Sequence, residues 1–133
     1  MNEATSLYER LGRHEGILKL VKPFYADVRQ HAVLGGIFNS HIQDWNAHME
    51  KITEFWALQS GGQSKYGGGF AGAHMSLGLR PEHFQNWLAL WEFNNARQLP
   101  SREAAEMNEL AHRLAGRLFV VTQRQRERND AEV

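Results

Sequence analysis

The chain has 133 residues, fifteen basic and fifteen acidic side chains, and no cysteine. With 42% hydrophobic and 23% charged residues it has the composition of one ordinary globular domain, and its balanced charge gives no long-range attraction to nucleic acid or to an anionic membrane surface. The lack of cysteine excludes disulfides, a thiolate nucleophile, an iron–sulfur cluster and a cysteine-based zinc site.

We therefore expect a single domain over residues 1–133, with a core from 7 to 121 and a frayed polar tail over 122–133. The first six residues lack a basic, apolar leader, and no stretch approaches the roughly 18 apolar residues of a membrane span. These features predict a cytoplasmic protein with no membrane or nucleic-acid partner.

The N-terminal third shows one interrupted helical pattern. Residues 6–9 have the spacing of a capping box, and apolar residues then recur at three- and four-residue steps from Leu18 to Val28. Pro23 lies inside this pattern and should bend or divide the helix. Gly35 and Gly36 should end regular structure, which would place Phe38 on a connection or short turn.

Asp44 is a good N-cap for a helix over about 45–59. His48, Ile52, Phe55 and Trp56 share one face of that helix, so this histidine should point inward. Glycine at 61, 62, 67, 68, 69 and 72 predicts a long irregular loop after it.

Two more helices should follow this loop. One begins at Pro81-Glu82 and buries an aromatic stripe that includes Trp87, and the last begins at Pro100-Ser101. No segment alternates apolar and polar residues, so the coarse prediction is an all-α fold of five or six helices.

Several enzyme motifs are absent, including the nucleophile elbow, the phosphate-binding loop and the zinc motif H-E-x-x-H. His74 is the most informative of the seven histidines, because it follows the glycine-rich loop and has Ala71, Ala73, Met75, Leu77 and Leu79 around it. One interpretation is a buried histidine whose ring nitrogens are satisfied by backbone groups. The other is a haem iron ligand in an apolar slot.

Taken singly, the remaining candidates do not identify a function. Tyr25, His48 and Trp87 fit a packed core as well as a binding site, and an aromatic residue on a helix is most often core. The same holds for four further aromatic residues, Phe24, Phe38, Phe55 and Trp56.

Their combination closely resembles the truncated haemoglobins. The resemblance rests on Phe24-Tyr25, the run 33–38, Trp45-Asn46-Ala47-His48 with Phe55-Trp56, and then Tyr66, His74 and the run 81–88. It covers about residues 7–121, and His48 together with Trp87 looks most like the third group of that family. The resemblance implies a two-over-two helical sandwich that binds haem.

Position by position, the resemblance makes His74 the proximal iron ligand and Phe38 the ring against the porphyrin. It puts Tyr25, His48 and Trp87 at the distal polar positions. The neighbouring apolar residues of the site are Ile52, Phe55, Trp56, Leu77 and Leu79.

Three hypotheses about function remain open. The first is reversible O2 binding on one non-covalent haem b with pentacoordinate iron, where the distal donors hydrogen-bond the bound ligand. The second is redox chemistry in the same pocket, such as nitric oxide dioxygenation, peroxide reduction or nitrite reduction, with an external reductase. The third is a helical binding module without cofactor, whose aromatic residues are only core.

Charged residues near the expected pocket add weaker signals. Lys65, Arg80 and His83 are candidates for the haem propionates by position, although each fits a solvated surface charge at least as well. The basic tail segment over 124–128 is interrupted by glutamine and glutamate, and we interpret it as a solvated end.

Overall fold

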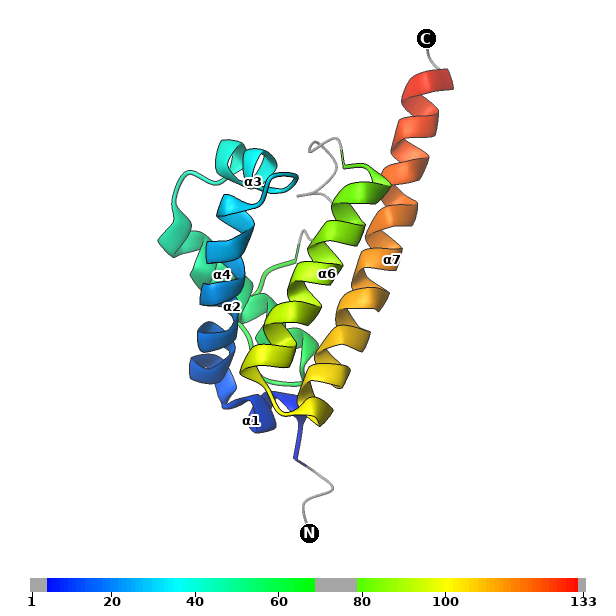
Figure 1. Cartoon of the computed structure of the whole chain (residues 1–133). Helices are drawn as coiled ribbons and strands as arrows, with labels where there is room; N and C mark the ends of the chain where they lie inside the picture. Colours follow the sequence, from blue (N-terminus) through cyan, green and yellow to red (C-terminus); the bar gives the residue numbers. More distant parts are fainter. Residues whose placement is uncertain (1–4, 69–78, 132–133) are drawn as a thin grey trace.

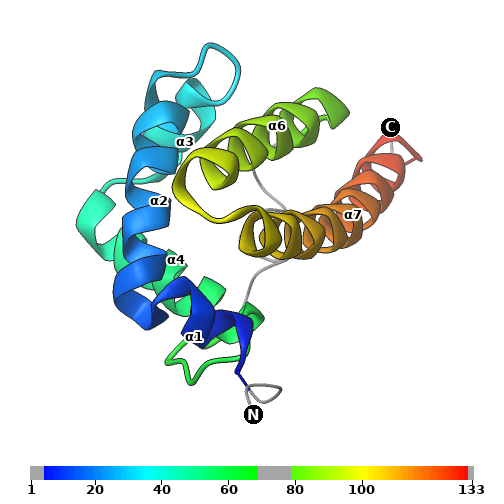
Figure 2. The same ribbon diagram turned by 60° about the horizontal axis from the view of Figure 1, so that its bottom comes forward.

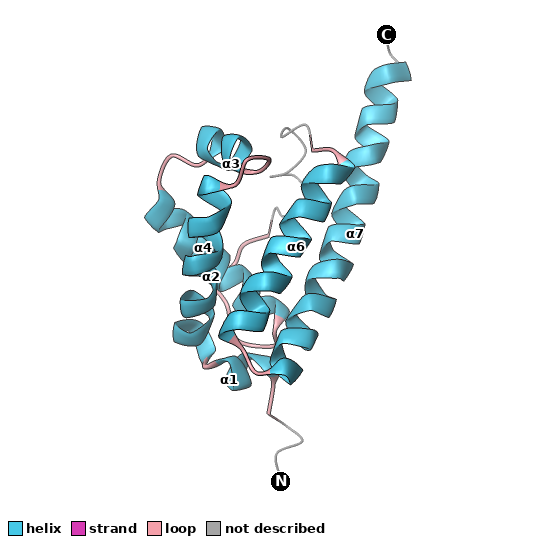
Figure 3. Cartoon of the chain, in the orientation of Figure 1, coloured by secondary structure: helices cyan, strands magenta, loops and turns pink. Residues whose placement is uncertain are grey.

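The computed structural model describes residues 5–68 and 79–131, and in this part of the chain all regular structure is helical (Figure 3). The helices are α1 (Leu7–Leu11), α2 (Arg13–Gln30), α3 (Gly35–His41), α4 (Trp45–Gln59), α6 (Pro81–Gln98) and α7 (Ser101–Ala131). This confirms the predicted all-α class. None of the described helices is both long and apolar enough to cross a membrane.

The helices form two layers. Helices α2 and α4 pack together, α6 and α7 run side by side, and α2 also contacts α6 (Figure 1). The view in Figure 2 separates the two pairs, with the short α1 and α3 at their ends. This arrangement is the predicted two-over-two helical sandwich.

Local signals in the sequence explain where several helices begin. The Ser6 hydroxyl accepts from the Glu9 N–H at 3.2 Å at the start of α1, and Asp44 caps α4 in the same way. Gly12, with φ near +98°, ends α1 in the left-handed region that favours glycine. Helix α6 begins at Pro81 and α7 at Ser101, as predicted.

Three sequence expectations are changed by the structure. At Pro23 a bend or a division of the helix is expected, and the structure excludes the division, because buried residues on both sides of Pro23 hold one helix together and the carbonyl it leaves unbonded belongs to the exposed Lys19. Gly35 starts α3 instead of ending regular structure, so Phe38 lies on a short helix. A Cβ atom at Gly35 would come within 2.8 Å of the Arg29 carbonyl oxygen, so the glycine permits close packing there.

The third difference concerns the C-terminal segment. Residues 122–131 were expected to fray, but α7 continues without interruption to Ala131. Thr122 is still buried, and the glutamine, arginine and glutamate residues from 123 to 128 are good helix formers. The segment therefore extends the last helix beyond the start of the antiparallel α6, as Figure 1 shows.

The predicted glycine-rich loop is partly described. Residues 62–68 form no regular structure, in agreement with the expectation. Residues 69–72 lie outside the described residues.

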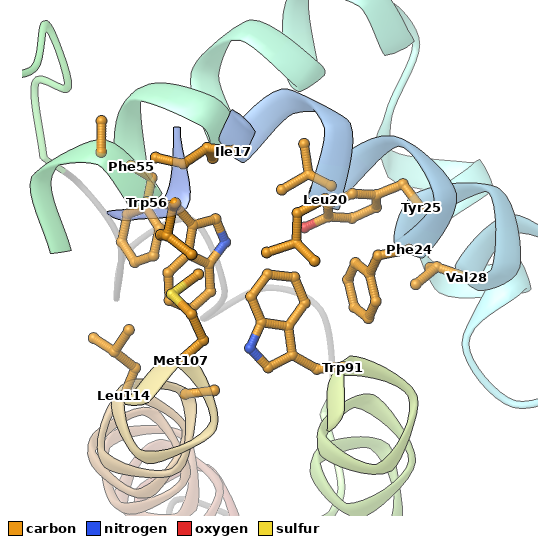
Figure 4. Packing of buried hydrophobic residues seen from close by; sticks show 14 of the residues in the cluster. Ile17, Leu20, Phe24, Tyr25, Val28, Phe55, Trp56, Trp91, Met107 and Leu114 are labelled. Carbon is orange, nitrogen blue, oxygen red and sulfur yellow. The ribbon is translucent and has the colours of Figure 1, made fainter. Parts of the chain in front are cut away.

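The core lies where the two layers meet. Trp91 from α6 reaches toward α2 and α4 and is fully buried beside Phe24 and Trp56 (Figure 4). Met107 and Leu114 of α7 close the cluster from the other side.

Candidate functional site

A cavity of about 290 Å³ opens between the two layers of helices. Its wall is mostly aromatic and aliphatic, and it takes residues from α2, α3, α4, α6 and α7. Eight of the ten predicted site residues line it: Tyr25, Phe38, His48, Ile52, Phe55, Trp56, Leu79 and Trp87. His74 and Leu77 lie outside the described residues.

Tyr25 is the polar group that α2 contributes to this cavity. Its side chain is only 4% exposed, and its ring packs against Phe24, Phe38 and His48. Burial raises the pKa of the Tyr25 hydroxyl far above its ordinary value. The hydroxyl therefore stays protonated at physiological pH and is available as a donor, since no hydrogen bond to it is seen in the described part of the chain.

His48 faces Tyr25 from the neighbouring helix. It lies one turn into α4, so the Asp44 cap that starts this helix also sets the direction of the histidine. The two ring centroids are 5.2 Å apart with their planes nearly perpendicular, and Trp45 contacts both rings. The predicted inward direction of His48 is confirmed, and Tyr25 and His48 form one polar corner of a mostly apolar wall.

Trp87 reaches the cavity from α6 and is held by a stack of indole rings. It stacks on Trp91 with centroids 5.6 Å apart, and Trp91 stacks on Trp56 at 4.8 Å. Phe24 meets the edges of this stack. Because Trp91 is fully buried, the stack fixes Trp87 and Trp56 at two places on the cavity wall.

Sequence reasoning missed part of the wall. Helix α7 closes the cavity with small and aliphatic residues, none of which is among the predicted site residues. These residues are Ala111, Leu114, Ala115 and Leu118. Two more wall residues were missed: Ile37, which directly precedes Phe38, and Ile42, which lies four residues after it. Their proximity in the sequence to an expected pocket residue was the available signal.

Besides His48, three groups that can carry positive charge line the cavity: the exposed Lys51 and His41 and the half-buried His83. The Nδ1 atom of His83 accepts from the Arg80 N–H at 2.8 Å, so its Nε2 carries the proton of the neutral ring and is a donor. Of the predicted propionate candidates, only His83 lines this cavity. Lys65 lies on a second, open groove, and Arg80 is an exposed residue just before α6.

Comparison with known protein families agrees with this geometry. The bacterial-like globin family matches residues 6–119. This chain belongs to the bacterial-like globins. This placement agrees with the resemblance to truncated haemoglobins in the sequence.

Individual relatives support the same placement. A group 3 truncated haemoglobin from Campylobacter jejuni is 40% identical over 83 residues, which span 59% of this chain and 65% of that protein. A group 1 truncated haemoglobin from Mycolicibacterium paratuberculosis is 32% identical over 62% of this chain and 60% of its own length. The chain thus matches less than two thirds of the length of either curated relative.

A solved structure extends the match to most of the chain. The crystal structure of a group III truncated haemoglobin from Campylobacter jejuni superposes with a TM-score of 0.75 and 32% identity, covering 80% of this chain and 87% of the other. The predicted similarity to the third group is therefore confirmed.

The cavity residues suit a haem. A porphyrin needs an apolar slot with aromatic walls, and its carboxylates need donors where the slot opens. The wall offers Phe38, Phe55 and Trp56 for the first requirement and Lys51 and His83 for the second.

Proposed function

We propose that the cavity holds one haem b, with His74 as the iron ligand, and that the protein binds O2 and other small ligands at a pentacoordinate iron. The observation that carries the proposal is the contact between the Tyr25 and His48 rings within an apolar cavity of a globin fold. The chain has no cysteine for a thioether link, so the haem would be held without covalent bonds. When bound, haem supplies the iron that takes up a diatomic ligand.

The distal residues would hold the ligand by hydrogen bonds. The Tyr25 hydroxyl is a permanent donor because burial keeps its pKa high, and the His48 ring and the Trp87 indole can each present an N–H. If two such donors each contribute about 1 kcal/mol net, they slow ligand escape roughly thirtyfold. This favours retention of the ligand over rapid unloading.

Other wall residues would hold the macrocycle itself. Phe38, Ile52, Phe55 and Trp56 supply flat or branched apolar surface, with Leu79 and Leu77 completing the site by resemblance. The Lys51 ammonium and the His83 Nε2–H are the donors in the cavity wall that suit two carboxylates.

Absorption spectra test this proposal. Adding haem to the purified protein should give a one-to-one complex with a Soret band, and the ferrous form should be five-coordinate and shift on addition of CO. Unchanged spectra after haem addition would reject haem binding. A six-coordinate ferrous spectrum without added ligand would reject the pentacoordinate iron and point to coordination by a distal residue such as His48.

A second candidate function is redox detoxification in the same pocket. The observation that favours it is again the Tyr25–His48 corner, since the Tyr25 hydroxyl can hydrogen-bond an oxygen species held beside it and the His48 imidazole is a group that can transfer a proton. Nitric oxide dioxygenation, peroxide reduction and nitrite reduction all need electrons from outside, so we infer an external reductase as partner. Turnover with a reductase in wild type and Tyr25→Phe tests it, and turnover no faster than that of free haem would exclude it.

A further inference from the structure

A hydrogen-bonded chain outside the cavity joins α1, α2 and α4. The Tyr8 hydroxyl lies 2.6 Å from the His14 Nδ1 atom, and the His14 Nε2 atom lies 3.0 Å from the Glu54 Oε2 atom. The Tyr8 and His14 rings meet edge to face, with centroids 5.4 Å apart. Three residues from three helices thus form one connected cluster.

The chemistry of Glu54 sets the direction of these bonds. Its pKa is lowered, chiefly by the hydrogen bond from the Lys65 backbone N–H and also by His14, so the carboxylate is ionised and only accepts. The His14 Nε2 must therefore carry a proton and donate. In the neutral ring the Nδ1 atom then accepts from the Tyr8 hydroxyl, which makes Tyr8 the group that orients the histidine.

The other side of Glu54 holds the segment that follows α4. Its Oε1 atom accepts from the Lys65 N–H at 2.8 Å, and its backbone carbonyl accepts from the Ser64 hydroxyl at 2.5 Å. The Ser64 oxygen in turn accepts from the Tyr66 N–H at 3.0 Å. Glu54 therefore fixes two successive residues immediately before Tyr66.

Tyr66 is where this chain of contacts reaches the cavity. Its ring meets the Phe55 ring edge to face at 5.2 Å, and both rings line the cavity. Tyr66 also lines the open groove on which His14 and Glu54 lie, so it separates the two spaces. A shift of Tyr66 would change the shape of the cavity wall.

The Tyr8 ring has a second contact with the same segment. A Cβ atom at Gly62 would come within 2.5 Å of the Tyr8 ring, and the Tyr8 N–H donates to the Ser60 carbonyl at 2.9 Å. The chain after α4 thus lies directly against Tyr8. Tyr8 of the short helix α1 therefore contacts both His14 and the segment that follows α4.

We propose that Tyr8 and His14 are positioning residues for the cavity: they orient the Glu54 carboxylate, which fixes Lys65 and thereby holds Tyr66 against Phe55. The positioning of Tyr66 concerns this chain alone. Its consequence for haem, slower loss of the bound group, rests on the function proposed above.

Amide hydrogen exchange on the full-length protein, in the form in which it is purified, tests the positioning. His14→Phe should speed exchange at the Lys65 and Tyr66 amides at least about fivefold, although His14 contacts neither amide, because a hydrogen bond to a charged acceptor is lost. Tyr8→Phe, which keeps the ring against Gly62, should give a smaller change in the same direction.

Other variants separate positioning from general stability. Glu54→Gln keeps an oxygen for the Lys65 N–H and should retain more protection than Glu54→Ala. Adding His14→Phe to Glu54→Ala should speed exchange at the two amides no further, because His14 acts through Glu54. His112→Phe is the matched control, because it makes the same change in another histidine–glutamate pair, with Glu92, away from the cavity, and it should leave these amides unchanged.

The result that would overturn the proposal is unchanged exchange at Lys65 and Tyr66 in both His14→Phe and Tyr8→Phe. An equal rise throughout α1, α2 and α4 would also overturn it, since His14 would then support the fold in general. Haem transfer to apomyoglobin, measured separately, should be several-fold faster in His14→Phe. If the protein takes up no haem, the proposed function fails while the exchange data still decide the positioning.

Discussion

Tyr25→Phe isolates the contribution of one hydroxyl group to ligand binding. The Tyr25 side chain is 4% exposed, and four rings (Phe24, Phe38, Trp45 and His48) surround it. Phenylalanine preserves these ring contacts, and the lost hydroxyl has no hydrogen-bond partner in the described part of the chain. We therefore expect little change in the thermal midpoint.

The effect should appear in the rate of ligand release. A donor to a partly negative ligand contributes about 1 to 1.5 kcal/mol net, so O2 should dissociate about five to twelve times faster from the variant. CO, which carries less negative charge at its outer atom, should change less. Stopped-flow displacement of O2 by CO gives the dissociation rate directly.

The pH dependence provides a second check on Tyr25. Burial raises the pKa of the hydroxyl, so its neutral donor form persists well above the ordinary value of 10. The ratio of variant to wild-type dissociation rates should then stay constant from pH 6 to about pH 10. Equal rates in the two proteins, or a ratio that collapses between pH 7 and pH 9, would refute the assignment of Tyr25 as a permanent donor.

Further predictions concern stability and haem retention. Trp91→Ala should lower the free energy of unfolding by about 3 to 5 kcal/mol in denaturant titrations, because it empties a fully buried site. Leu58→Ala, at a half-exposed position, should change this free energy little. Similar losses in the two variants would contradict the described packing of Trp91. Arg10 pairs with Glu106 and lowers the pKa of that carboxyl. The ion pair therefore stabilises the fold fully above pH 4.5, the pKa of the carboxyl in the unfolded chain, and this stabilisation is lost as the pH falls through the lower pKa of the folded protein. Arg10→Ala should therefore lower the thermal midpoint more at pH 7 than at pH 3, and an equal loss at both would exclude the ion pair as the cause. Lys51→Glu should speed haem transfer to apomyoglobin roughly threefold at low salt, with less effect at high salt, and no change would remove Lys51 as a propionate partner.

Local signals in the sequence were enough to predict most of the helices. An aspartate cap and a three-to-four-residue apolar stripe defined α4 to the residue, and Pro81 and Ser101 marked the starts of α6 and α7. These features act over one or two turns, so a sequence shows them directly.

The errors arose where distant contacts decide the outcome. Pro23 is a local signal for a bend or a break, and the break does not occur because burial of Phe24 and Val28 against other helices outweighs one missing hydrogen bond. Gly35 was interpreted as a terminator, whereas its role is to let α3 approach Arg29. Leu114 and Leu118 carry no local signal for a binding site, and only the packing of α7 across the cavity shows that they line it.

The same distinction between local signals and distant contacts applies to the candidate site. Resemblance to a family brought together residues from five separate parts of the chain, and the structure places eight of them around one cavity. The chain from Tyr8 through His14 to Glu54 could not be anticipated, because it depends on three helices and a loop meeting outside the cavity.

The central claim is that His74 binds the iron of a haem in this cavity, and cavity complementation tests it most directly. His74→Gly should lose the five-coordinate ferrous spectrum of the wild type, and added imidazole should restore that spectrum by occupying the vacated place. A variant that keeps the wild-type spectrum without imidazole would contradict the claim and assign the iron to another side chain.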